Sequence, residues 1–481
     1  ITISSSGNVD AIGIITASSF RGDGSQLTGV DSTTIKDSDG TVRVQGTTSG
    51  IVITGIATAG KLGIGFTDTN IKIGSTALDS LTTGDNNVAV GNAALTANEG
   101  GSQNTAVGGE ALDANSTGNY NTAVGRNALG ANTTASSNSA LGTSALQENT
   151  TGSSNTAVGA FALDANTTGA NNTACGQDAL SANTTANSNT AIGTNALLVN
   201  TTGAENTAVG KDSLRANTTA SENTAVGTDA LTDNTTGTSN VAVGRMALGN
   251  NTTASGNTAL GTDALFTSTT GSENTSVGHN SMFANTTGSH NVAVGSNALD
   301  ANTTASSNTA LGVSALTTNT TGSVNTAVGR QAMQSNTTGA YNVAVGYFAL
   351  NANTTANYNV ALGTNSLSAN TTGGPNVAIG YNAVTSNQTG NNNIGIGLEA
   401  LRYNVSGHNN VAIGNDALED NTASNNTAIG HNSLKENTTG GNNTAVGKNS
   451  LDANTTGNSN TAVGNDTLSA NTTGAGNVAI G

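Results

Sequence analysis

One phrase of seventeen residues is repeated with little variation along most of this chain. The segment that begins at Asn155 reads NTAVGAFALDANTTGAN, and the segment that begins at Asn172 reads NTACGQDALSANTTANS. Numbered from its first Asn, the phrase starts at residue 70 and recurs every seventeen residues up to 410, and then starts again at 426, 443, 460 and 477. Fixed spacing of this kind is typical of stacked-repeat proteins, in which each repeat contacts only its neighbours.

Several positions of the phrase hardly vary. Position four is apolar, position five is Gly in every copy, position nine is Leu except at Met282, Met333 and Val384, and position twelve is Asn with few exceptions such as Ser268. Only six residues separate positions five and twelve, which is too few for an isolated helix. We therefore expect two short strands per phrase, over Asn-Thr-Ala-Val and Ala-Leu-x-Ala, joined by a Gly-led turn and an Asn-Thr-Thr-Gly turn.

The alternation of a strand decides which positions face the interior. Positions two and four lie on one face of the first strand, and the small residue at position three lies on the other. We expect the apolar residue at position four and the Leu at position nine to fill each coil, which makes Cys175, at position four, a small core residue. Two such side chains do not offset the backbone entropy of an ordered coil, so we expect the Ala-bearing faces to be buried between associated chains.

Stacked coils satisfy the backbone because each strand pairs with the equivalent strand above and below it. The predicted fold is all-β, a parallel β-solenoid of about 24 seventeen-residue coils over residues 70–481. Side chains of the same position then form columns, with Asn ladders at positions one and twelve and Thr ladders at thirteen and fourteen. At about 4.8 Å per coil, the rod is roughly 115 Å long. The phrase at residue 410 is one residue short, and the loss falls at 421–423, so this side of the coil is predicted to be the turn.

Composition excludes several classes of function. The net charge is −16 and only 9% of residues are charged, so nucleic acid is excluded as a partner because phosphate binding needs clustered Lys and Arg. No run of eighteen apolar residues is present, so no membrane insertion is expected in this segment. The four His residues are scattered, and no nucleophile, base and acid recur together. We expect no catalytic site, no cofactor and no metal site.

Residues 1–69 do not share the period. Short alternating runs at 1–5, 13–17, 41–44 and 51–56 are separated by Gly, Asp and Ser, which predicts a separate short all-β segment that also covers the first coil's edge. The triplet Arg21-Gly22-Asp23 matches a cell-attachment motif, and the run at 37–40 resembles the opening of a calcium loop. A turn explains each of them, since no Glu closes the second at the required spacing.

The phrase NTAVGxxALxANTTG, as at 155–169, resembles the head repeats of trimeric autotransporter adhesins of the YadA type and, more closely, repeats of phage tail-fibre proteins. The segment GIITASSF at 13–20, followed by GDGSQLTGV at 22–30, is similar to a recurrent element of cyanophage structural and tail-fibre proteins. The resemblance implies a left-handed parallel β-roll, a homotrimer about a common axis, and exposure on a virion or cell. The adhesin repeats are shorter than seventeen residues, so the additional Asn-Thr-Thr-Gly residues are expected to form a larger outward loop.

The resemblance thus implies a structural fibre protein, a rigid trimeric shaft or receptor-binding segment of a phage tail fibre used in host attachment. Its partners would be its own copies, other tail or fibre proteins, and a host receptor that is a glycan or a protein. A bacterial trimeric surface adhesin, located at the cell surface, is the alternative, and an ice-binding solenoid is a third. Position six varies most, so surface contacts are expected there, unless these side chains are merely solvated: Arg126, Lys211, Arg245, Arg330, Tyr347 and Tyr381.

Overall fold

The computed structural model describes residues 2–3, 9–10, 34–36, 42–47, 50–53 and 69–481. The chain divides into two compact units, Ile1–Thr67 and Asp68–Gly481. The first unit holds an antiparallel pair, β1 (Thr2–Ile3) with β2 (Val9–Asp10), and an antiparallel sheet of β3 (Thr34–Lys36), β4 (Val42–Thr47) and β5 (Gly50–Ile53). Three predicted features lie outside the described residues: the run at 13–17, the Arg-Gly-Asp triplet and the segment 37–40.

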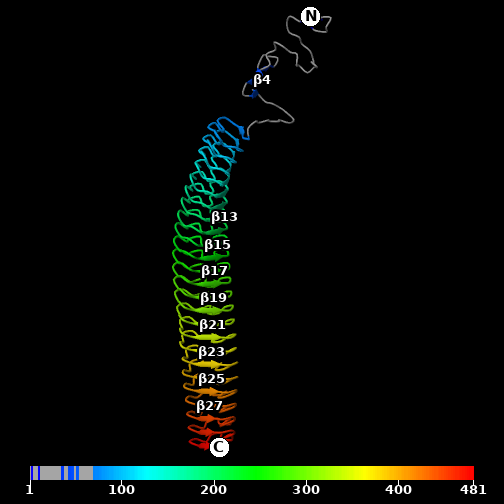
Figure 1. Cartoon of the computed structure of the whole chain (residues 1–481). Coiled ribbons are helices and arrows are strands. Elements are labelled where there is room, and N and C mark those ends of the chain that lie inside the picture. Colours follow the sequence, from blue (N-terminus) through cyan, green and yellow to red (C-terminus); the bar gives the residue numbers. More distant parts are fainter. Residues whose placement is uncertain (1, 4–8, 11–33, 37–41, 48–49, 54–68) are drawn as a thin grey trace. The chain divides into compact units, whose positions relative to one another are not determined.

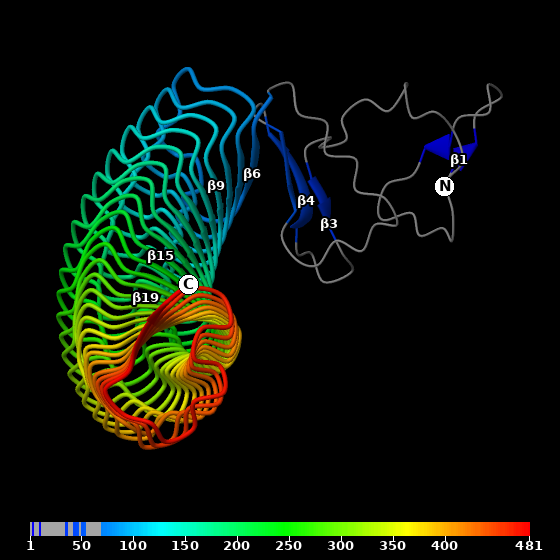
Figure 2. The ribbon, with the colours of Figure 1, turned by 90° about the horizontal axis from the view of Figure 1, so that it is seen from below.

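The second unit is a parallel β-solenoid with one coil per phrase, and no helix occurs in residues 69–481. Its coils stack into a long, gently curved rod with the strands along one side (Figure 1), and seen from below each coil is shifted slightly from the one before it, so that the stack follows an arc (Figure 2). The strands form one parallel sheet in which residue i pairs with residue i+17, as Ala157 does with Ala174. The predicted solenoid is confirmed.

Each strand covers positions two to four. The strands are β6 (Ile71–Ile73), β7 (Val88–Val90), β8 (Thr105–Val107), β9 (Thr122–Val124), β10 (Ser139–Leu141), β11 (Thr156–Val158), β12 (Thr173–Cys175), β13 (Thr190–Ile192), β14 (Thr207–Val209), β15 (Thr224–Val226), β16 (Val241–Val243), β17 (Thr258–Leu260), β18 (Thr275–Val277), β19 (Val292–Val294), β20 (Thr309–Leu311), β21 (Thr326–Val328), β22 (Val343–Val345), β23 (Val360–Leu362), β24 (Val377–Ile379), β25 (Ile394–Ile396), β26 (Val411–Ile413), β27 (Thr427–Ile429), β28 (Thr444–Val446), β29 (Thr461–Val463) and β30 (Val478–Ile480).

The second strand expected in each phrase is absent from the described coils, so that prediction is wrong. Positions six to eleven form turns, and positions seven and nine adopt left-handed backbone angles, as in Phe161 (φ 57°) and Leu163 (φ 56°). These turns are still hydrogen bonded from coil to coil: the Leu163 amide donates to the Ala179 carbonyl at 2.9 Å. Because the stack satisfies the turn backbone directly, no extended segment is needed there.

The interior of the coil is filled by smaller residues than predicted. Ala at positions three and eight and Leu at position nine are fully buried, whereas the apolar residue at position four faces outward: Leu141 is 51% exposed, and Cys175 is exposed as well. The packing of position three explains this, because a Cβ added to Gly395 would lie only 2.4 Å from Cγ2 of Val384 in the preceding coil. Position three therefore packs directly against position nine. The expectations that position four fills the core and that the Ala face lies between chains are both wrong.

Two buried columns of Asn hold successive coils together, as predicted. At position one, the Asn206 amide donates to Oδ1 of Asn189, and its Nδ2 donates to the Ala220 carbonyl, both at 2.9 Å. At position twelve, Nδ2 of Asn217 donates to Oδ1 of Asn200 at 2.8 Å and to the same Ala220 carbonyl at 3.0 Å. The two ladders thus converge on the buried carbonyl of position fifteen.

The short coil at residue 410 keeps its strand in register. Val411 of β26 pairs with Thr427 of β27, sixteen residues later, and the missing residue is absorbed in the turn that contains Asn421. Nδ2 of Asn421 donates to Ala423, two residues along instead of the usual three, and Oδ1 of Asn404 in the preceding coil has no partner. The predicted side for the turn is confirmed, at the cost of one hydrogen bond of the ladder.

Gly at position five is required by both backbone angle and space. In Gly261, φ is +139°, and a Cβ would lie 2.6 Å from the carbonyl oxygen of Gly278 in the next coil. Such angles are essentially restricted to Gly. Position fifteen differs in its backbone angle, because its Gly residues do not have positive φ. A Cβ on Gly271 would lie 2.3 Å from the carbonyl oxygen of Gly288, but Ala replaces Gly naturally at residues such as Ala254 and Ala305, so the stack accommodates a Cβ there.

We therefore expect Gly261→Ala to be markedly more destabilising than Gly271→Ala at position fifteen of the same coil. The difference should be about 1 to 3 kcal/mol, because only the first change forces a side chain into a Gly-only conformation. Thermal unfolding followed by circular dichroism and local hydrogen exchange both measure it. Equal effects of the two substitutions would contradict this account of position five.

Ser268 breaks the ladder at position twelve, and Oδ1 of the fully buried Asn251 consequently has no partner. Ser268→Asn should restore the missing bond and raise the free energy of unfolding by about 1 kcal/mol. The matched reverse change, Asn234→Ser, should create a second break and lower it by about 1 to 3 kcal/mol. Denaturation of the two variants side by side tests the pair, and a destabilising Ser268→Asn would rule out the ladder as a source of stability.

Candidate interaction surface

The outer face of the parallel sheet carries an apolar stripe along the rod. Positions two and four point outward from every strand, and position four is apolar in each of them. The most exposed large apolar side chains within β7–β29 protrude at intervals: Leu141, Leu260, Leu311 and Leu362 are 45 to 51% exposed. Further apolar side chains of this face with more than a third of their surface exposed are Ile192, Val226, Val241, Val292, Val343, Ile413, Ile429 and Val463. We call this surface the sheet face.

A long apolar stripe of this kind is uncommon on the surface of a monomeric protein. The inner side of the same strands explains how it arises. Position one carries a buried Asn, position three a buried Ala and position five a Gly, so the larger apolar residues of the strand have only the outer side left. The period of two in a strand makes this separation strict.

The six contact residues predicted at position six are all exposed. The structure brings only two of them together: the guanidinium of Arg330 lies 5.8 Å from the ring centre of Tyr347 in the next coil, and Tyr347 packs edge-on against Phe348. Lys211 pairs with its neighbour Asp212, a hydrogen bond that raises the pKa of Lys211, and Nη2 of Arg245 lies 3.0 Å from Oδ2 of Asp263. These six residues therefore line a column without forming a single site; they are Arg126, Lys211, Arg245, Arg330, Tyr347 and Tyr381.

Sequence reasoning missed a second exposed column, at position seventeen. Tyr341 and Tyr358 occupy it in successive coils, and their rings stack with centroids 5.3 Å apart. The sequence did contain a signal, because five of its six Tyr residues lie between residues 341 and 403. The predicted contact residues lie instead at position six, where long side chains occur along the whole repeat region.

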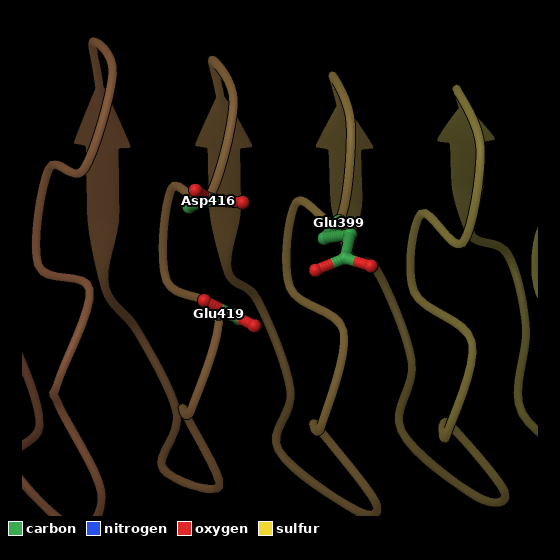
Figure 3. A group of neighbouring side chains, drawn as sticks. All are labelled: Glu399, Asp416 and Glu419. Carbon is green, nitrogen blue, oxygen red and sulfur yellow. The ribbon is translucent and has the colours of Figure 1, made fainter.

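Three carboxylates lie close together near the short coil. Glu399 comes from one coil, and Asp416 and Glu419 come from the next, with oxygen atoms within 4.8 Å of one another (Figure 3). Two cations offset part of their charge: Nη1 of Arg402 lies 2.9 Å from Glu399, and Nζ of Lys435 lies 3.4 Å from Glu419. Burial raises the pKa of Glu419, and Lys435 opposes that rise. The group is therefore an ion-pair network between coils.

A hollow of about 280 Å³ lies near the N-terminal end of the rod, where Gly130 provides no side chain at position ten. Glu110, Asp113 and Glu148 line it, together with Asn127. Burial, and then repulsion from Glu110, raises the pKa of Asp113. Burial likewise raises the pKa of Asp164 and of Asp300, which occupy position ten in other coils. In these three coils, partial burial of the carboxyl at position ten therefore favours its neutral form.

Two described His residues serve contacts between coils. Nε2 of His290 lies 3.0 Å from Oε2 of Glu273, and Nδ1 of His408 accepts a hydrogen bond from the Asn391 amide at 2.9 Å. No helix long and apolar enough to cross a membrane occurs among the residues that the structure describes.

No protein-family model matches this chain, and neither a curated protein nor a solved structure matches it significantly.

The raised pKa of Asp113 makes stability depend on pH. Between the unfolded value of 3.8 and the higher folded value, the folded chain holds more protons, so stability falls as pH rises through this window. Asp113→Asn should therefore be more stable than the natural chain at pH 7, and the difference should vanish well below pH 3.8. Glu205→Gln, at an exposed carboxylate, is the control. Thermal unfolding at both pH values provides the measurement, and a benefit that does not change with pH would contradict the argument.

Proposed function

We propose that this chain is a rigid shaft or receptor-binding segment of a trimeric phage tail fibre that takes part in host attachment. The observation that carries the proposal is the sheet face, an apolar surface on a rod otherwise covered by Asn, Thr and Ser. Its partners would be two further copies of this chain, other tail or fibre proteins, and a host receptor, and its location would be the virion. We propose no enzymatic activity for it.

The energetics of the sheet face support self-association. Burying the exposed half of a Val or Leu side chain contributes about 1 kcal/mol. The same contribution recurs in coil after coil of the rod, and part of the sum is offset by the cost of association. A partner that is itself a rod of the same pitch can match this surface along its length, and a second copy of the chain has that pitch. The number three comes from the resemblance of the phrase to trimeric fibre and adhesin repeats.

The alternative is the head of a bacterial trimeric surface adhesin, which would use the same sheet face and would lie at the cell surface. The third possibility, ice binding, requires ranked Thr hydroxyls that are free to order water. Thr at position thirteen does not meet this requirement, because Oγ1 of Thr167 donates to the carbonyl of Thr184 at 3.0 Å. The Thr residues of position fourteen, such as Thr338 and Thr355, are left for that role.

Charge placed on the sheet face should separate the copies. Ile192, at position four, is 41% exposed, and Val199, at position eleven in the turn of the same coil, is 38% exposed. Ile192→Asp should weaken assembly because it would bury a carboxylate between apolar faces, whereas Val199→Asp should leave assembly unchanged. Light scattering after size exclusion should give three times 46.8 kDa for the natural chain and a lower mass for Ile192→Asp at low concentration. A natural chain of 46.8 kDa, or equal behaviour of the two variants, would contradict the proposed trimer.

The proposed location needs a separate experiment. Antibodies raised against residues 70–481 should label the tail region of virus particles in electron micrographs. Labelling of bacterial surfaces in the absence of virus would instead support the adhesin alternative.

A further inference from the structure

A short row of exposed apolar side chains occupies position seventeen of four successive coils. Val324, Tyr341 and Tyr358 are 44, 54 and 60% exposed, and Pro375, also exposed, follows in the fourth coil. We call these four residues the tyrosine ridge. The two rings are nearly parallel, with an interplanar angle of 13° and centroids 5.3 Å apart. Flat rings in direct contact are about 3.5 Å apart, so these rings are offset and each leaves part of its face open.

The backbone holds the ridge in place. Position seventeen adopts a left-handed conformation in both residues, with φ of 58° in Tyr341 and 61° in Tyr358. Their amides donate to the Ser323 and Ala340 carbonyls of the preceding coils at 3.2 and 3.3 Å. The rings are therefore attached to a regular, hydrogen-bonded scaffold, and a ligand would lose little entropy in ordering them.

The fold does not require aromatic residues at this position. Most other coils carry Ser, Asn or Glu there, and Tyr120 occupies it alone, at 63% exposure, between coils that carry Gln103 and Ser137. An exposed offset pair adds only about 1 kcal/mol to stability. The ridge thus places two large apolar surfaces in water at sites where a small polar side chain is sufficient for folding.

The surroundings of the ridge carry almost no charge. Arg330 is the only charged side chain in residues 325–398, although the whole chain has a net charge of −16. Such a surface offers no complement to an anionic polymer or to a charged peptide. An uncharged ligand avoids the cost of leaving ionic groups desolvated and unpaired.

Polar residues suited to hydroxyl recognition occupy the same turns as the two Tyr residues. Thr338 and Thr355, at position fourteen, are exposed, and the structure shows no hydrogen bond for either hydroxyl within residues 69–481. Asn357 is exposed, and its side chain is oriented by its Oδ1, which accepts a hydrogen bond from the Ala340 backbone amide at 2.6 Å. Flat apolar surfaces flanked by a few oriented donors and acceptors match a molecule with apolar faces and a rim of hydroxyl groups.

We infer that the tyrosine ridge binds an uncharged oligosaccharide, with sugar rings stacked on the open faces of Tyr341 and Tyr358 and their hydroxyls bonded to Thr and Asn of the same turns. This inference rests on the proposed role in host attachment and specifies the chemical class of the receptor. The ridge lies outside the two columns of the sheet face, so occupation of one surface does not require the other.

Immobilised oligosaccharides test the inference directly. The full chain is applied to an array of uncharged hexose and N-acetylhexosamine oligosaccharides, with sialylated and sulfated ones alongside. The natural chain should be retained by a subset of the uncharged ligands. The double variant Tyr341→Ala/Tyr358→Ala should bind about tenfold more weakly or worse. Tyr120→Ala, the same change at the same position of another coil, should bind like the natural chain, and Tyr341→Phe/Tyr358→Phe should retain most binding.

Several results would overturn the inference. These are retention by no uncharged oligosaccharide, a preference for the sialylated or sulfated ligands, or equal losses in the double variant and in Tyr120→Ala. A fall in the assembled mass of the double variant would show that the ridge joins copies of the chain instead. This test and the antibody test of location can fail separately. If the antibodies label bacterial surfaces, the chain could still bind oligosaccharides through the tyrosine ridge. If they label virions but no oligosaccharide retains the chain, only the inference about the ridge is contradicted.

Discussion

The buried carbonyl of position fifteen is the group on which the rest of the coil depends. It lies inside the coil, away from water, and a buried acceptor without a partner costs about 1 to 3 kcal/mol. Two Asn side chains satisfy it, as Asn206 and Asn217 do for Ala220, and each of them also bonds to the coil before it. The same pair of bonds must be made again in the next coil. The sequence is monotonous because each coil is both a copy and the binding partner of its neighbour.

This interior has a consequence for the surface. Asn, Ala and Gly occupy the inward positions of the strand, and Ala faces Leu at close range, as the space around Gly395 and Val384 shows. No room remains inside for a Val or Leu at position four, so these residues form the sheet face. The interior thus supplies hydrogen bonds and close contacts, while much of the apolar surface of the strands is left on the outside of the rod.

The period, the parallel register, the Asn ladders and the turn side of the coil could be predicted from the sequence, because spacing alone determines which residues meet in a stack. The direction of the side chains could not. Alternation places Ala157 and Val158 on opposite faces, and the prediction placed the larger apolar residue inside because its burial contributes more free energy. The thickness of the coil determines which of the two residues faces inward. This thickness depends on the left-handed turns at positions seven and nine, and residues such as Phe161 and Leu163 give no sign in the sequence that φ is positive there. The stacked pair of Tyr341 and Tyr358 at position seventeen was not predicted, because the prediction of surface contacts rested on the variable position six.

The only cysteine of the chain provides the most direct test of the central claim, that the sheet face is buried between copies. Cys175 lies at position four on this face, and it is exposed in the single chain. The account predicts that Cys175 of the natural assembly reacts slowly with a water-soluble thiol reagent, reacts rapidly once the copies are separated by Ile192→Asp, and forms cross-links between chains with a short bifunctional reagent. Reaction of Cys175 at the rate of a free thiol in the undissociated natural protein would contradict it.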